Sequence, residues 1–215
     1  LEFRRVLFRS NLALTLLLEG RWEEAESLLT EALKRARIIF GPERPYTLHL
    51  QHMLARVLAD AGRPDQAEEL ARKTLDARRL VTPPGHEGTG RALLYWGRAL
   101  VEQNKLDEAA PPLREALKLF QENYPMKPEL ALQAANWLGA IHLARGDLPA
   151  AKDLLLPSAE LLLEPTSQMS AIEKRAAIGH IIKLLQALGQ NEQAAVWQKK
   201  LEALAASATD TRAWR

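Results

Sequence analysis

Two histidines, His49 and His52, are the residues of this chain whose spacing most suits metal chemistry. Three positions apart on a helix, both rings lie on one face, where they could bind a metal ion. No third ligand lies near them in sequence, His86, His142 and His180 are isolated, and the chain has no Cys. It also lacks a nucleophile motif and a glycine-rich phosphate loop. We therefore predict no catalytic residue, no metal site, no cofactor and no enzymatic activity for this chain.

A second set of side chains suits binding. Met53, Tyr95 and Trp137 follow one another at intervals of 42 residues, and Arg56 and Arg98 share that interval. An extended peptide could stack on the aromatic rings and place acidic groups near the guanidinium groups. The residues of this predicted peptide-binding groove are His52, Met53, Arg56, Tyr95, Arg98, Asn136, Trp137 and Lys183.

Each part of this groove has a structural alternative. Aromatic residues at helical spacing often pack in a core, and Trp96, next to Tyr95, is expected there. Arg56 and Arg98 could instead be solvated, or form ion pairs with Asp60 and Glu102, each four residues further on. The sequence leaves both interpretations open.

The elements that must position these residues repeat along the chain. Four Gly and one Asn stand at positions 20, 62, 104, 146 and 189, and an Ala follows each by five residues. On both sides of each such turn, apolar residues recur at the spacing of an amphipathic helix. Gly and Asn adopt the left-handed conformation that ends a helix at low cost. The sequence therefore predicts repeated helical hairpins, about one for every 42 residues.

The expected helices pair across these turns. Small residues recur before each turn, at Ala13, Ala55, Gly97 and Gly139, and predict close helix crossings with the later Ala. Within the helix expected at 148–163, Pro157 predicts a kink. The expected helix pairs are 11–19 with 22–39, 46–61 with 64–80, 89–103 with 106–122, 128–145 with 148–163, and 168–188 with 191–206.

These features together resemble the tetratricopeptide repeat family. The pairs Leu12-Ala13, Leu54-Ala55, Trp96-Gly97 and Leu138-Gly139, the turn Gly and the later Ala fit its consensus, and the connector at 41–47 resembles that of kinesin light chains. The resemblance implies an all-α, right-handed superhelical solenoid of about five antiparallel hairpins. It also implies a protein or peptide partner held on the wall built by the first helices. Of the clamp that binds chaperone tails, only Asn136 fits.

A narrower resemblance concerns the last hairpin. The segment at 189–204 resembles the C-terminal regions of bacterial serine/threonine protein kinases, although the chain has none of the kinase motifs. We expect a non-catalytic fragment of a larger signalling protein. The alternatives are a regulatory or docking region of such a kinase, and an effector-sensing array of a transcription regulator.

The two ends of the chain set the limits of the array. Residues 1–10 match the translated end of a common sequencing-library adapter, so we interpret them as a non-native tail and expect natural sequence upstream to be missing. The array then covers 11–206, with repeats near 11–45, 46–87, 88–127, 128–167 and 168–206. The segment 207–215 is expected to be frayed.

Composition limits the partners. The formal charge of +2 comes from 29 basic and 27 acidic residues, and without the tail's three Arg and one Glu each sign numbers 26. A charge of zero argues against nucleic acid as partner. The apolar runs are far shorter than the roughly 20 residues that span a membrane, so we expect no membrane segment here. The absence of Cys mildly favours a reducing compartment, the cytoplasm.

Overall fold

The structure, a computed structural model, describes residues 2–159 and 169–213. Within these ranges the chain forms ten α-helices and one 3₁₀ turn and contains no strand, which confirms the predicted all-α class. The helices are α1 (Glu2–Leu18), α2 (Trp22–Ile39), α3 (Pro45–Asp60), α4 (Pro64–Val81), α5 (Glu87–Glu102), α6 (Leu106–Asn123), α7 (Pro128–Ala144), α8 (Leu148–Leu155), α9 (Ala171–Ala187) and α10 (Asn191–Ala213).

Consecutive helices pair into five hairpins, and the left-handed residue predicted between the partners is present in each. The φ angles are 75° at Gly20, 72° at Gly62, 61° at Asn104, 76° at Gly146 and 73° at Gly189. At the first turn, the Arg21 N–H donates to the Leu16 carbonyl at 2.8 Å, which closes the end of α1. The turn chemistry read from the sequence therefore sets the hairpins.

Proline and small polar residues fix where the helices begin. Pro45, Pro64 and Pro128 each occupy the first position of a helix, where no backbone N–H is lost from the ladder. The Asp147 side chain accepts from the Ala150 N–H at the start of α8. Ser170 and Glu173 form a reciprocal capping box at the start of α9.

Helix lengths differ from the prediction at three places. The helix expected at 148–163 is interrupted near the expected kink: α8 ends at Leu155, and a 3₁₀ turn, Leu156–Ser158, follows it because Pro157 has no N–H to donate. The end of that expected helix lies outside the described residues. At the chain ends, α1 begins at Glu2 and α10 extends to Ala213. The adapter origin of residues 1–10 and the fraying of 207–215 stay predictions.

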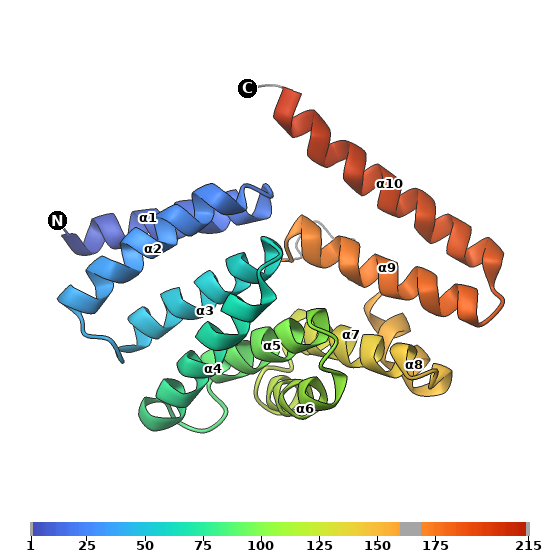
Figure 1. Cartoon of the computed structure of the whole chain (residues 1–215), viewed down its shortest axis with the longest axis horizontal. Coiled ribbons are helices and arrows are strands. Elements are labelled where there is room, and N and C mark those ends of the chain that lie inside the picture. Colours follow the sequence, from blue (N-terminus) through green and yellow to red (C-terminus); the bar gives the residue numbers. More distant parts are fainter. Residues whose placement is uncertain (1, 160–168, 214–215) are drawn as a thin grey trace.

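The hairpins follow one another along an arc, from the blue N-terminal pair to the red C-terminal pair (Figure 1). Each helix packs against the next, and the first helices of successive hairpins, α1, α3, α5, α7 and α9, also contact one another. We call these five the inner helices. The small residues allow close approach: a Cβ added at Gly97 would lie 2.4 Å from Leu113 Cγ of α6.

The arc curves strongly enough to join hairpins that are distant in sequence. The start of α9 lies beside the end of α3 (Figure 1), where Arg56 and Glu173 form an ion pair at 2.6 Å. This contact joins the second hairpin to the fifth. Among the described residues, no helix has the length and apolar character needed to cross a membrane.

Candidate functional site

The inner helices of the first three hairpins enclose a cavity of about 560 Å³. We call it the inner cavity. Its walls come from the C-terminal half of α1, one face of α3, the side chain of Arg78 from α4, and the start of α5, with Tyr124 at one edge. One part of this wall is apolar and the other carries Arg and His side chains, so the cavity offers two kinds of contact.

The apolar wall is formed mainly by α1. Leu14, Leu17 and Leu18 line it from one side, and Met53 of α3 lines it beside them. Leu14 and Leu18 are exposed large apolar side chains, 38% and 41% accessible, so this wall is not covered by other parts of the described chain. An apolar group entering the cavity would bury them.

The cationic wall centres on Arg78, whose side chain reaches between α3 and α5. Arg78 is 1% exposed, and its Nη2 group lies 3.4 Å from Nδ1 of His52. Burial lowers the pKa of Arg78 to about 10, which still leaves the guanidinium protonated at neutral pH. Burial, followed by the nearby His49 and the Arg residues, also holds the pKa of His52 well below its ordinary value. His52 is therefore neutral and accepts a hydrogen bond from Arg78.

The start of α5 completes this wall. The Gly88 N–H donates to Nδ1 of His86 at 3.0 Å, and the Glu87 N–H donates to the Tyr124 hydroxyl at 2.6 Å. The Glu87 carboxylate pairs with Arg91 at 2.8 Å and with Lys127 at 2.7 Å. The Glu87 charge is thus already balanced by two cations.

Next to the cavity, and sharing Arg56 with its wall, five charged side chains form what we call the inner ion network: Arg56, Asp60, Arg98, Glu102 and Glu173. The guanidinium of Arg98 lies 2.7 Å from Asp60, 2.8 Å from Glu102 and 3.7 Å from Glu173, and Arg56 lies 2.6 Å from Glu173. Two cations therefore share three carboxylates where α3, α5 and α9 meet.

The pKa values in the inner ion network follow from burial and charge. Burial alone would raise the pKa of Glu173, but Arg56, Arg98 and two hydrogen bonds involving Ser170 outweigh it, so the pKa lies below its ordinary value. At Asp60 and Glu102, burial outweighs Arg98, and both pKa values are raised. Of the three carboxylates, Glu173 is thus the one most firmly held as an anion.

The structure places four of the eight predicted groove residues in the wall of the inner cavity and the other four outside it. His52, Met53, Arg56 and Tyr95 line the inner cavity. Arg98, Asn136 and Trp137 are buried further along the inner helices: Arg98 lies over the Trp137 ring at 5.4 Å, and Asn136 bonds His180 at 2.8 Å. Lys183 is exposed on α9.

Burial bears on the alternatives that the sequence left open. Trp137 packs in the core and is 8% exposed, whereas Tyr95, 1% exposed, borders the inner cavity. The two rings therefore do not form one open aromatic ladder. Arg98 forms the ion pair with Glu102. Arg56 pairs with Glu173, 117 positions away, which the local pattern could not predict.

The sequence did not indicate Arg78, Arg91 or Glu173 as site residues. Arg78 lies on α4, the second helix of its hairpin, whereas the expected wall was built by the first helices alone. One signal was present: Gly88, at the start of α5, leaves space that Arg78 fills, and a Cβ there would lie 2.2 Å from Arg78 Nη1. For Glu173, the capping box marked the helix start but not its distant partner.

The histidine pair is placed as the spacing predicted, on one face of α3, with ring centroids 4.8 Å apart. In the described part of the chain, no group of three or more His, Cys, Asp or Glu side chains is arranged to hold a metal ion. His52 instead contacts Arg78 and stacks near Tyr95, at 6.4 Å.

Successive helical hairpins around a hollow inner face define a helical-repeat scaffold. Two family models, both described as "Tetratricopeptide repeat", match this chain, one over residues 5–80 and the other over 52–123 and 94–156. The chain therefore belongs to the tetratricopeptide repeat family, whose arrays bind proteins or peptides and are typically non-catalytic. A search of curated protein sequences finds no match.

Solved structures share the fold. A putative kinesin light chain from Podosopora anserina with TPR-like repeats has a TM-score of 0.65 at 20% identity, over 96% of this chain and 97% of that one. BtubC (BKLC) from P. vanneervenii has 0.63 at 19%, over 97% and 89%. A Rap protein complexed with competence and sporulation factor has 0.73 at 14%, over 97% of this chain and 66% of that one.

Proposed function

We propose that the chain is an interaction scaffold that holds a peptide, or an extended segment of a protein, against the inner helices of its first three hairpins. The observation that carries this proposal is the inner cavity, about 560 Å³ in volume, with a partly exposed apolar wall opposite a cationic one. A peptide offers both apolar and charged groups and could contact both walls at once.

The structural comparisons support a role of this kind. The Rap protein, which has this fold over 97% of the present chain, is named as a complex with competence and sporulation factor. By analogy with that complex, a small factor could be held by this array.

Four of the predicted groove residues keep their proposed role. His52, Met53, Arg56 and Tyr95 line the inner cavity, where a partner could contact them. Asn136, Trp137 and Arg98 are buried, so we propose that they support the inner wall from behind. Lys183, exposed on α9, would contact only a partner that extends beyond the cavity.

Peptide selection on the immobilised full chain tests the proposal. Enriched peptides would be synthesised and their affinities measured for two matched variants, Leu14→Trp and Ile38→Trp. Leu14 is 38% exposed in the cavity wall, whereas Ile38 is 79% exposed on α2, away from the cavity. We expect Leu14→Trp to weaken binding by at least about tenfold, because its indole fills the cavity, and Ile38→Trp to bind like the wild type. Equal binding by both variants would place the peptide elsewhere and refute the proposal.

We further propose that the array acts within a larger signalling protein. The second candidate is an effector-sensing array, favoured by the Rap complex, and the third is the regulatory region of a kinase, favoured by the sequence of the last hairpin. Recovering the upstream reading frame distinguishes them. A DNA-binding helix-turn-helix would support the second, and a catalytic loop the third.

A further inference from the structure

We propose that the inner cavity is an anion-binding site for a ligand that combines an anionic group with an apolar part. Arg78 is the counter-ion of the anionic group. The inference deepens the proposed function and rests on it for the source of the anion, a carboxylate of the bound peptide. It depends on three observations: an unbalanced buried charge, the helix end beside it, and the apolar wall opposite.

The charge of Arg78 is not balanced by the described chain. Its Nε and Nη1 atoms are buried without a hydrogen-bond partner among the described residues, and its Nη2 atom lies 3.4 Å from Nδ1 of the neutral His52. No described carboxylate lies within ion-pair distance of it. A buried cation without a partner is costly, because the protein interior solvates it poorly.

The surroundings of Arg78 increase this cost. Its guanidinium lies against Gly88 in the first turn of α5, so close that a Cβ at Gly88 would overlap it. The N-terminal end of a helix carries a partial positive charge, which does not stabilise a cation. The N–H groups of this turn already donate to Tyr124 and His86, so Arg78 is the group that is left to bind an anion.

The other arginines of the cavity wall differ from Arg78 in this respect. Arg56 pairs with Glu173 and Arg91 with Glu87. Both carboxylates belong to the chain itself, so these charges are balanced before any ligand arrives. Arg78 is the described cavity residue whose charge requires an anion from outside.

The apolar wall indicates what carries the anion. Leu14, Leu17, Leu18 and Met53 line the same cavity, and a bare ion would leave them uncovered. A group that combines a carboxylate with an apolar side chain, as the last residues of a peptide do, would neutralise Arg78 and cover these side chains together.

Small-molecule probes test this anion-binding site without a protein partner. The full chain is titrated with N-acetyl-Leu-Leu, which ends in a carboxylate, with its neutral C-terminal amide, and with inorganic phosphate, while NMR follows the signals of the cavity. We expect the carboxylate probe to bind at least about tenfold more tightly than the amide and more tightly than phosphate.

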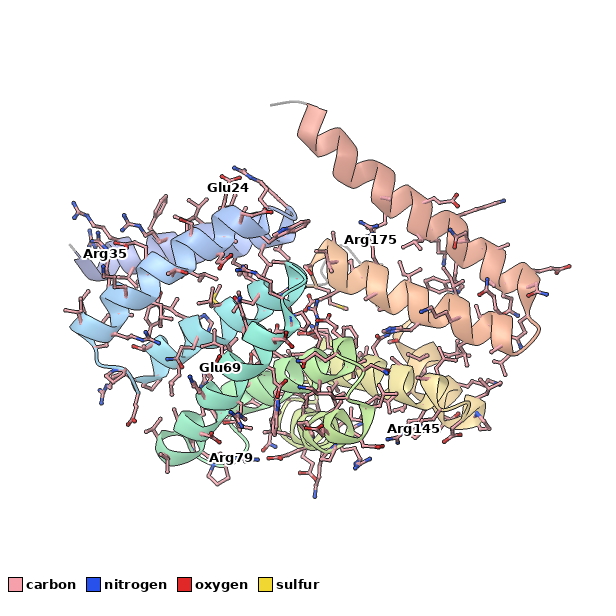
Figure 2. All side chains as sticks on the ribbon, in the orientation of Figure 1. Glu24, Arg35, Glu69, Arg79, Arg145 and Arg175 are labelled. Atoms are coloured by element: carbon pink, nitrogen blue, oxygen red, sulfur yellow. The ribbon has the colours of Figure 1, made fainter. Side chains whose placement is uncertain are left out.

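Three variants locate the binding on Arg78. Arg78→Met should abolish the preference for the carboxylate, and Arg78→Lys should retain part of it because the charge remains. Arg79→Met is the matched control: Arg79 is the next residue, lies at the periphery of the molecule (Figure 2) and pairs with Glu115, so this variant should bind like the wild type. Urea unfolding confirms that each variant is folded.

Several outcomes would overturn the inference: equal affinity for the acid and the amide, an unchanged preference in Arg78→Met, or a preference for phosphate over the peptide acid. The proposed function fails separately. If the probe binds through Arg78 but selected peptides bind Leu14→Trp as well as the wild type, the anion-binding site is supported and the proposed peptide-binding face is refuted. If selected peptides require the cavity but not Arg78, the peptide-binding face is supported and the anion-binding site is refuted.

Discussion

Arg78 and Arg98 are both 1% exposed on the inner side of the array, yet their surroundings differ. Arg98 lies among Asp60, Glu102 and Glu173 in the inner ion network. Arg78 lies beside a neutral histidine and a helix N-terminus. The first guanidinium is part of the architecture, whereas the second has a charge that the described chain leaves unbalanced.

This difference follows from the curvature of the array. The start of α9 contacts α3 and α5, so Glu173 forms ion pairs with Arg56 and Arg98, which are more than 70 positions away in sequence. The cavity lies on the other side of Arg56, among the first three hairpins. Because the array curves, the arginines of one part of the inner face pair with a carboxylate of the chain itself. The neighbouring part, the inner cavity, is left available to a ligand.

The largest effect is expected from Arg98→Met. The substitution leaves the side-chain volume similar but removes the cation from three carboxylates, two of which have raised pKa values because they are buried. Breaking a buried ion pair from one side costs about 3–5 kcal/mol. Urea unfolding followed by circular dichroism measures this loss. A free energy of unfolding within about 0.5 kcal/mol of the wild type would show that the inner ion network does not stabilise the fold.

Glu173→Gln should have the next largest effect. The amide keeps the shape but loses the charge that Arg56 and Arg98 share, and hydrogen bonds to charged groups contribute about 1.5–3 kcal/mol. The loss should also appear in hydrogen exchange, as faster exchange at the start of α9, since this contact joins the second and fifth hairpins. The matched control is Glu115→Gln, an exposed carboxylate paired with Arg79, which should change the free energy of unfolding by less than about 1 kcal/mol.

Much of the fold could be predicted from the sequence because hairpin formation is local. A left-handed Gly or Asn, a Pro at the first helical position and an amphipathic stripe act within a few residues, and every hairpin turn was located correctly. The irregularity near Pro157 has the same local origin: α8 ends at Leu155 and a 3₁₀ turn follows where a kink was expected.

The site was harder to predict because it depends on curvature. The 42-residue register correctly placed His52, Met53, Arg56 and Tyr95 on the inner helices, but a register does not say how tightly successive hairpins wind. The curvature of the array determines whether Trp137 is exposed on the inner face or buried in the core. It also determines whether Glu173 contacts Arg56. Arg78 was missed because it belongs to a second helix and reaches the inner face only where Gly88 leaves space.

Acid should weaken the array through three histidines whose pKa values are lowered: His49 and His52 in the cavity wall, and His180 beside Trp137. Burial lowers the pKa of His180, beside Trp137, to about 4 and that of His52, beside Arg78, well below its ordinary value. For a base with a lowered folded-state pKa, the stability is fully present above about pH 6.5 and is lost as the pH falls towards the folded-state value. We expect each histidine to remove about 1–2 kcal/mol between pH 7 and pH 5.

The variants His52→Gln and His180→Gln remove two of these contributions and leave that of His49. Each should flatten the dependence of the urea midpoint on pH over this range, and the double variant should flatten it further. Glu173 does not interfere, because its pKa is below the ordinary value of 4.5 and its contribution is lost only at more acidic pH. A dependence as steep in the double variant as in the wild type would contradict this assignment.

Arg78→Met should have the smallest effect and the opposite sign. Because the described chain gives Arg78 no carboxylate, its removal leaves no orphaned anion, and a buried cation is replaced by an apolar side chain of similar length. We expect the free energy of unfolding without ligand to stay unchanged or rise by about 1 kcal/mol, whereas the same substitution at Arg98 lowers it. The urea midpoints of Arg78→Met, Arg98→Met and Arg79→Met, measured together, test the comparison directly. A loss at Arg78 as large as that at Arg98 would mean that both guanidinium groups stabilise the fold, and the distinction between a balanced and an unbalanced arginine would fail.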